Sequence, residues 1–200
     1  MTDTSVETVH RLPQDPVHLY QLAQGQDAYY NAMGCGAFST AMALSVYDRA
    51  FGSYEQARAI FGQMIKVPFF GGTFEHQNAA LAHRFGYVAD FYMNGTLADL
   101  LPAIDLGAPV ILLVNPGPLG LGQHDVLLVG YSEVAGAPLH LFLDNTAVES
   151  PSQPAPPGLT YPGNQTLTLA DLSGKWTGGF TPFFRDSATQ AQWRRQAHRG

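Results

Sequence analysis

The stretch that decides the fold is residues 31–44, NAMGCGAFSTAMAL. It holds Cys35, the one cysteine among 200 residues, between two glycines. From Cys35 to about Phe51 the apolar residues recur at helical spacing, which predicts a helix that begins at or beside the thiol. Cys35 is then either a small packing residue, as free cysteines commonly are, or a nucleophile placed at a helix N-terminus. Only partners elsewhere in the chain distinguish these two interpretations.

Further helices are predicted directly after this one. Residues 53–65 begin with Ser53 and carry Gln56 three positions on, which is a capping-box arrangement. Residues 73–86 form a third predicted helix, with Thr73 as its cap and a glycine at its end. The first half of the chain is therefore predicted to be mostly helical.

The second half of the chain has the pattern of a sheet. Residues 108–115, APVILLVN, form a continuous run typical of a buried strand. HDVLLVGYSE and PLHLFLDNT are two further predicted strands, and VAGA between them predicts a hairpin turn. Helices first and mostly antiparallel strands afterwards predict an α+β fold, with a helical part packed on a sheet.

Composition limits the domain organisation and the classes of partner. With 46% hydrophobic and 13% charged residues, residues 1–200 are expected to form a single domain. We expect an extended leader over 1–20, a core over about 21–185 and a polar tail over 186–200. A net charge of −6 argues against nucleic acid, and no run of about 20 apolar residues suggests a membrane span.

The presence of a single cysteine also excludes two kinds of stabilising cross-link. One thiol forms neither an internal disulfide nor a cysteine-built zinc site. No secretory signal is visible at the N-terminus, so a reducing, cytoplasmic location is expected. We expect no cofactor and no metal, because His76, His83 and Glu75 supply too few ligands at suitable spacing. The sequence does not determine the oligomeric state.

A nucleophilic cysteine needs a histidine, and His124 is the best-placed candidate. It follows a loop of glycines and prolines and opens the strand DVLLVGY, where a ring is held rigidly at the edge of a cleft. Asp144 ends the next strand, so an antiparallel hairpin brings it back beside His124. A surface histidine and a turn-forming aspartate are the ordinary interpretations of each residue alone. Together with Cys35, the three predict a nucleophile, a base and an orienting carboxylate.

The same segments resemble the papain-like cysteine peptidases of the bacteriocin-processing, double-glycine leader type. CGAFSTAMAL resembles that family's cysteine segment, QHDVLLVGY its GHFVVLVGY, and LFLDNTA its VLVNDPA. The likeness runs in consistent order from about Gln26 to Thr177. It implies a papain-like fold with a central N-terminal helix, and a triad of Cys35 as nucleophile, His124 as general base and Asp144 as the orienting acid.

The chain departs from the family pattern beside the nucleophile. Tyr29 occupies the position, six before the cysteine, at which the family carries its oxyanion-hole glutamine. Gln26 and Asn31 are the candidate amides for that role. Ala37 stands where a proline is usual, and Asp125 follows the histidine where an apolar residue is usual.

The predicted function is hydrolysis of a peptide or amide bond through a thioester, as in a thiol protease. The alternatives are a papain-like domain that binds a peptide or partner without catalysis, and an acyltransferase that uses the same triad. No transporter module accompanies the domain, which predicts against leader processing coupled to export. The sequence does not specify the substrate beyond a peptide or amide.

Overall fold

The computed structural model describes residues 6–23, 33–66, 73–115, 123–149 and 154–197. Its helices are α2 (Cys35–Ser45), η1 (Arg49–Phe51), α3 (Tyr54–Gln63), α4 (His76–Arg84), α5 (Leu97–Asp105), α6 (Leu169–Lys175) and α7 (Ser187–Ala197). Its strands are β1 (Glu7–Arg11), β2 (Val88–Ala89), β3 (Val110–Val114), β4 (His124–Val134), β5 (Ala137–Asp144), β6 (Gln165–Thr168) and β7 (Trp176–Phe184). The predicted α+β class is confirmed. No helix in these residues is long and apolar enough to cross a membrane.

The strands form one antiparallel sheet in the order β2-β7-β3-β4-β5-β6, and β1 also pairs with β4. β4 is long enough to take two neighbours along one edge, β3 over residues 124–128 and β1 over residues 130–134. Ala135 and Gly136, with φ of 51° and 80°, close the hairpin between β4 and β5. This left-handed pair matches the twist of the flanking strands, as the VAGA turn predicted.

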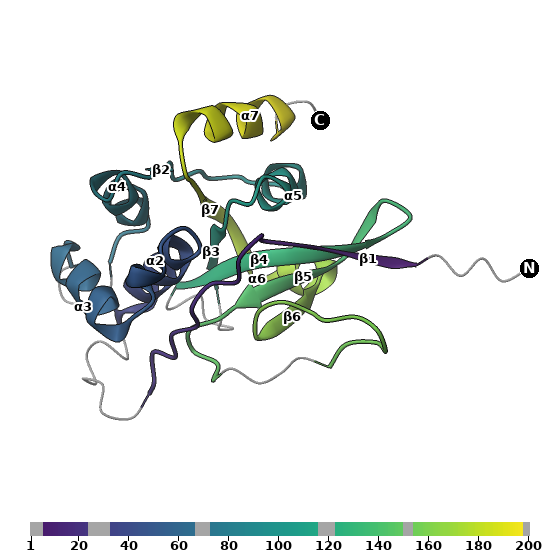
Figure 1. The fold of residues 1–200 in the computed structure, drawn as a ribbon, viewed down its shortest axis with the longest axis horizontal. Helices are drawn as coiled ribbons and strands as arrows, with labels where there is room; N and C mark the ends of the chain where they lie inside the picture. The colour runs from purple at the N-terminus through teal and green to yellow at the C-terminus, as the bar shows by residue number, and fades with distance from the viewer. Residues whose placement is uncertain (1–5, 24–32, 67–72, 116–122, 150–153, 198–200) are drawn as a thin grey trace, which may run out of the picture.

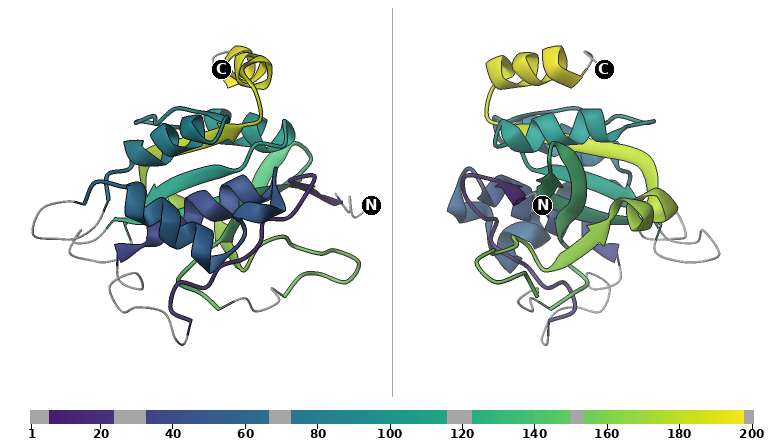
Figure 2. Two further views of the ribbon diagram at one scale, coloured as in Figure 1. Left: turned by 60° about the vertical axis from the view of Figure 1, so that its left-hand side comes forward. Right: turned by 90° about the vertical axis from the view of Figure 1, so that its right-hand side faces the viewer.

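Helix α2 lies at the centre of the molecule. Every residue after Cys35 in this helix is buried, because α3 packs on one side of it and β4 on the other. The Ser39 hydroxyl donates to the main-chain oxygen of Asp125 at 3.0 Å and so ties the helix to the start of β4. Figure 1 shows α2, α3 and α4 grouped beside the strands, and the right-hand view of Figure 2 shows α6 on the opposite side of the sheet.

The helix starts follow the predictions in one case and not in another. The Ser53 hydroxyl accepts from the Gln56 main-chain N–H at 3.2 Å, so the predicted cap of α3 is confirmed. Helix α4 begins later than predicted, with Glu75 rather than Thr73 at its N-cap position. Thr73 instead pairs with Lys66 in an isolated β-bridge, which takes its backbone out of the helix.

The two chain ends contain more structure than expected. Residues 7–11, predicted to be part of an extended leader, form β1 along β4, and Leu12 and Leu19 behind it are buried. Residues 187–197, predicted to be a polar tail, form α7 over α5. Trp193 anchors this helix: it is 1% exposed, and its Nε1–H donates to the Asp99 carbonyl at 2.8 Å. The N-terminal segment is extended, as expected, but it is paired in the sheet, and the C-terminal segment is a helix held by a buried indole.

Candidate active site

Cys35 is the first residue of α2 and lies beside the start of β4. Gly34 precedes it as the N-cap residue and offers no side-chain cap. The sulfur receives main-chain hydrogen bonds from Asp125, Gly36 and its own residue. Gly36 has to be small, because a Cβ there would lie 2.8 Å from Asp125 Oδ2. The helix start, the thiol and the beginning of β4 are therefore packed into direct contact.

The thiol is a weak acid in this setting. Burial, and after it the carboxylate of Asp125, raises the pKa of Cys35 to about 12, against the opposing main-chain hydrogen bonds. The residue as a whole is half-buried, yet its surroundings are dense enough for desolvation to dominate. The main-chain hydrogen bonds at the helix start lower the pKa of this thiol, but burial and the Asp125 carboxylate outweigh them. At neutral pH Cys35 rests as the protonated thiol.

His124 opens β4, as predicted, and its partner is Asn145. Its Nε2 lies 2.9 Å from Asn145 Oδ1. That oxygen also accepts the main-chain N–H of Ala147 at 2.9 Å, and Asn145 Nδ2 donates to Gln165 Oε1 at 3.1 Å. Because Asn145 Oδ1 can only accept a hydrogen bond, His124 Nε2 must be the donor. Nε2 therefore carries the proton, and Nδ1 is the basic nitrogen. Burial lowers the pKa of His124, with the Asn145 hydrogen bond acting in the opposite direction, so the ring rests neutral.

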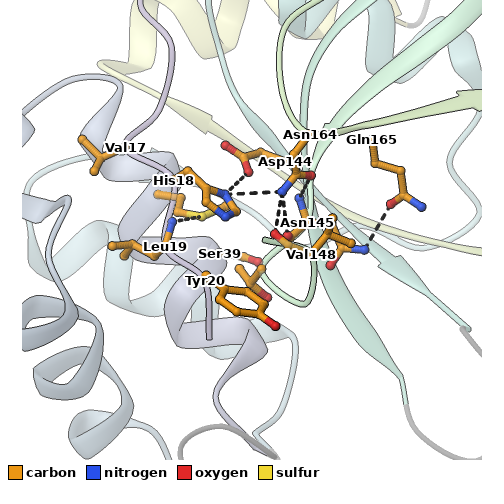
Figure 3. A network of polar contacts seen from close by, with 12 residues as sticks. Val17, His18, Leu19, Tyr20, Ser39, Asp144, Asn145, Val148, Asn164 and Gln165 are labelled. Carbon is orange, nitrogen blue, oxygen red and sulfur yellow. Dashed lines mark hydrogen bonds and ion pairs between the residues drawn. The ribbon is translucent and has the colours of Figure 1, made fainter. Parts of the chain in front are cut away.

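Asp144 pairs with another histidine. It lies opposite Leu127 in the β4–β5 register, and its Oδ1 bonds Nδ1 of His18 (Figure 3). Successive residues of a strand point to opposite faces, so Asp144 and Asn145 diverge. The prediction of Asp144 as the partner of His124 was wrong. When LFLDNTA and VLVNDPA are aligned letter by letter, the aspartate falls opposite Asn145, and this signal was present in the sequence.

The remaining predicted site residues fall into two groups. Gln26 and Asn31, the oxyanion-hole candidates, lie outside the described residues, as does Tyr29. The structure brings Cys35 against Asp125, the residue after His124, because the main chain of Asp125 forms a hydrogen bond with the sulfur. No hydrogen bond joins the two side chains in the described part of the chain.

Asp125 is the charged group that sequence reasoning left without a role. It is 6% exposed, and its Oδ2 accepts from Asn78 Nδ2 at 3.0 Å, while Oδ1 has no hydrogen-bond partner among the described residues. Burial raises the pKa of this carboxyl to about 7, with the Asn78 bond opposing the shift and the charge of Glu75 adding to it. Around neutral pH, Asp125 beside Cys35 therefore changes between its neutral and its charged form.

Removing this carboxylate is expected to make the thiol more acidic. In Asp125→Asn, alkylation of Cys35 by iodoacetamide at pH 8 should be roughly 10- to 100-fold faster, because a nearby buried charge contributes about one to two pKa units. The gain should shrink towards pH 6, where Asp125 in the natural chain is protonated. Mass spectrometry follows the reaction, with exposed Glu55→Gln as the control of equal charge change. An equal gain at pH 6 and pH 8 would contradict the electrostatic cause.

A small pocket adjoins the imidazole on the face of the sheet that carries α6. Its volume is about 120 Å³. Its walls mix aliphatic side chains with polar ones and consist of Val114, His124, Val126, Leu143, Asn145, Gln165, Leu167 and Lys175. In the described residues, no three His, Cys, Asp or Glu side chains gather where they could hold a metal ion. The groups available near the start of β4 are an oriented, neutral imidazole that lines the pocket and a thiol at the start of α2.

Comparisons with known proteins identify the family and the fold of the chain. The model of the peptidase C39-like family matches residues 14–143. Curated protein sequences give no match. A solved double-glycine-motif protease from an AMS/PCAT transporter, in complex with the leader peptide, is 17% identical, with 88% of this chain and 99% of that chain covered at a TM-score of 0.50. The peptidase domain of Streptococcus ComA, a bifunctional ABC transporter of a quorum-sensing pathway, is 16% identical, with 84% and 99% covered at a TM-score of 0.53. At these identities the likeness concerns the fold, and the predicted papain-like architecture is confirmed.

Proposed function

The chain belongs to the peptidase C39-like family, and from this premise we propose that it hydrolyses a peptide bond with Cys35 as nucleophile and His124 as general base. Asn145, rather than Asp144, orients the imidazole. The observation that carries the proposal is made at the start of β4. There the Cys35 sulfur accepts a hydrogen bond from the main chain of Asp125, and the ring of the preceding residue, His124, is hydrogen-bonded to Asn145.

The resting pair is neutral, so proton transfer accompanies attack. Nδ1 of His124 takes the thiol proton as Sγ bonds to the carbonyl carbon, and the carbonyl π electrons move to the oxygen. The main-chain N–H groups at the start of α2 are donors for that oxyanion, and Gln26 or Asn31 remains the predicted side-chain donor. The intermediate then expels the amine, which receives the proton from the imidazolium, and a thioester is left on Cys35.

Water completes the cycle. His124 removes a proton from a water molecule, whose oxygen attacks the thioester carbonyl. Collapse of the second intermediate releases the carboxylic acid, and the departing sulfur recovers its proton from the ring. Asn145 keeps Nε2–H donating throughout, which leaves Nδ1 as the basic nitrogen and stabilises the positive ring. The Cys35–His124 hydrogen bond is expected to form when the substrate closes the site.

The substrate class follows from the structural relatives. One relative is titled a double-glycine-motif protease in complex with its leader peptide, and we propose a peptide substrate of that kind here. A single free cysteine suits a reducing compartment, and on this ground we propose a cytoplasmic location.

The test is cleavage together with covalent capture by the full chain. We expect a quenched-fluorescent peptide with an internal Gly-Gly to be cut at least 10³-fold faster than by Cys35→Ala, since the covalent route is lost with the sulfur. A peptide aldehyde that ends in Gly-Gly should add one peptide mass to the natural chain and none to Cys35→Ala. Equal cleavage by both proteins would overturn the role of Cys35.

Binding without catalysis is the second candidate function. It is favoured by the raised pKa of the Cys35 thiol and by the fact that no hydrogen bond joins the side chains of Cys35 and His124 among the described residues. Binding of the Gly-Gly peptide with equal affinity by the natural chain and Cys35→Ala, without cleavage or adduct, would establish it. An acyltransferase would show itself differently, since an added amine would then divert the thioester to a new amide.

A further inference from the structure

We propose that Gln165 is a positioning residue that, together with the main chain of Ala147, fixes which nitrogen of His124 carries the proton. The proposal deepens the function proposed above and rests on it, since tautomer choice matters only if Nδ1 accepts a proton from Cys35. It starts from a property of Asn145: a carboxamide has an accepting end and a donating end of nearly equal shape. Unlike a carboxylate, it supports the required tautomer in one orientation only.

The reversed orientation would disable the base. With Nδ2 of Asn145 turned to the ring, His124 Nε2 would have to accept a hydrogen bond, and the imidazole proton would move to Nδ1. A protonated Nδ1 has no lone pair with which to receive the thiol proton. The amide orientation of Asn145 is therefore part of the catalytic geometry.

Two contacts hold the orientation that is observed. Gln165 Oε1 accepts from Asn145 Nδ2 at 3.1 Å, and the Ala147 N–H donates to Asn145 Oδ1 at 2.9 Å. The second contact comes from the main chain of the same loop. Gln165 supplies the only side-chain contact to Nδ2 among the described residues, and it lies at the start of β6, paired with Leu143 of β5.

The backbone beneath this amide is fixed separately. Asn164 Oδ1 accepts the Asn145 N–H at 2.8 Å, and Asn164 Nδ2 donates to the carbonyl oxygens of Asn145 and Val148 at 3.0 Å and 2.9 Å (Figure 3). Asn164 is 5% exposed and so keeps these bonds away from water. Asn164 therefore fixes the backbone of the loop, and Gln165 contributes to the orientation of the Asn145 side-chain amide.

The experiment compares Gln165→Leu with Gln165→Glu and with the pair Asn145→Asp plus Gln165→Leu in the full chain. Leucine removes the acceptor, so the fraction of His124 with its proton on Nε2 should fall, and kcat should drop about threefold to tenfold, the usual worth of one hydrogen bond. Glutamate keeps an acceptor and should retain the natural tautomer. An aspartate at 145 accepts with either oxygen, so in the double variant the tautomer should no longer depend on residue 165.

The direct readout is the ¹⁵N spectrum of the His124 ring, which identifies the protonated nitrogen without any substrate. The matched control is Gln63→Leu, the same exchange at an exposed position of α3. An unchanged tautomer in Gln165→Leu, or a double variant as impaired as Gln165→Leu, would overturn the proposal. If the chain does not cleave peptides at all, the spectrum still tests Gln165, whereas the Cys35 experiments test the proposed function.

Discussion

Replacing His124 with alanine is expected to slow peptide cleavage by about 10²- to 10⁴-fold, the usual contribution of a positioned general base. The effect should be large because the thiol has a pKa of about 12 and cannot rely on spontaneous ionisation at neutral pH. The loss should therefore lie in kcat, with KM little changed. Steady-state kinetics on the Gly-Gly peptide at pH 7.5 measure both constants.

The matched control for this variant is His83→Ala, because His83 is exposed on α4. It should retain full activity. Raising the pH should partly restore His124→Ala, since hydroxide then generates the thiolate directly. Turnover in His124→Ala within threefold of the natural chain would remove His124 from the mechanism.

Gly163→Ala is expected to cause a large loss of stability. Gly163 has φ of +74°, and a Cβ there would lie 2.3 Å from the carbonyl oxygen of Leu143. That carbonyl cannot retreat easily, because it belongs to β5 and accepts the Asn164 N–H at 2.9 Å. Overpacking and a strained backbone together should lower the free energy of unfolding by roughly 2 to 5 kcal/mol. Urea unfolding followed by circular dichroism measures this loss.

Gly158→Ala separates the two causes. Gly158 has φ of +86°, but no atom lies within 4 Å of the added Cβ. Backbone strain alone should cost about 1 kcal/mol there. If both variants lose the same stability, the clash with Leu143 is not the cause. Gly163→Ala should also reduce activity in the surviving folded protein, because it displaces Asn164, which holds the Asn145 loop.

The parts of the fold that could be predicted from the sequence are those governed by local pattern. The start of α2 at Cys35, the cap at Ser53 and the hairpin at Ala135–Gly136 all depend on residues within one turn of each other. The position of His124 at the mouth of β4 belongs to the same class, since the strand is a continuous run of apolar residues. Such features do not depend on distant packing.

The parts that failed depend on contacts made across the chain. Trp193 alone, by burial against α5, converts a polar tail into part of the core. The sign of the Cys35 pKa shift depends first on the burial of the thiol itself and then on the charge of Asp125, which lies 90 positions away. The partner of His124 was missed by one position, and in a strand one position exchanges the two faces. Pattern reasoning therefore predicted the elements that carry the candidate residues, but neither the partner of His124 nor the electrostatics of the thiol.

The bond between His18 and Asp144 has a consequence for how the protein is handled. Asp144 is 4% exposed and neighbours Asn145, while His18 belongs to a segment that looks dispensable in sequence. A shortened chain without residues 1–20 would leave that carboxyl group buried without its His18 hydrogen bond. It would also leave the edge of β4 over residues 130–134 without its neighbouring strand. The described part of the N-terminal segment is thus integral to the fold beside Asn145, and any shortened form of the protein should retain it.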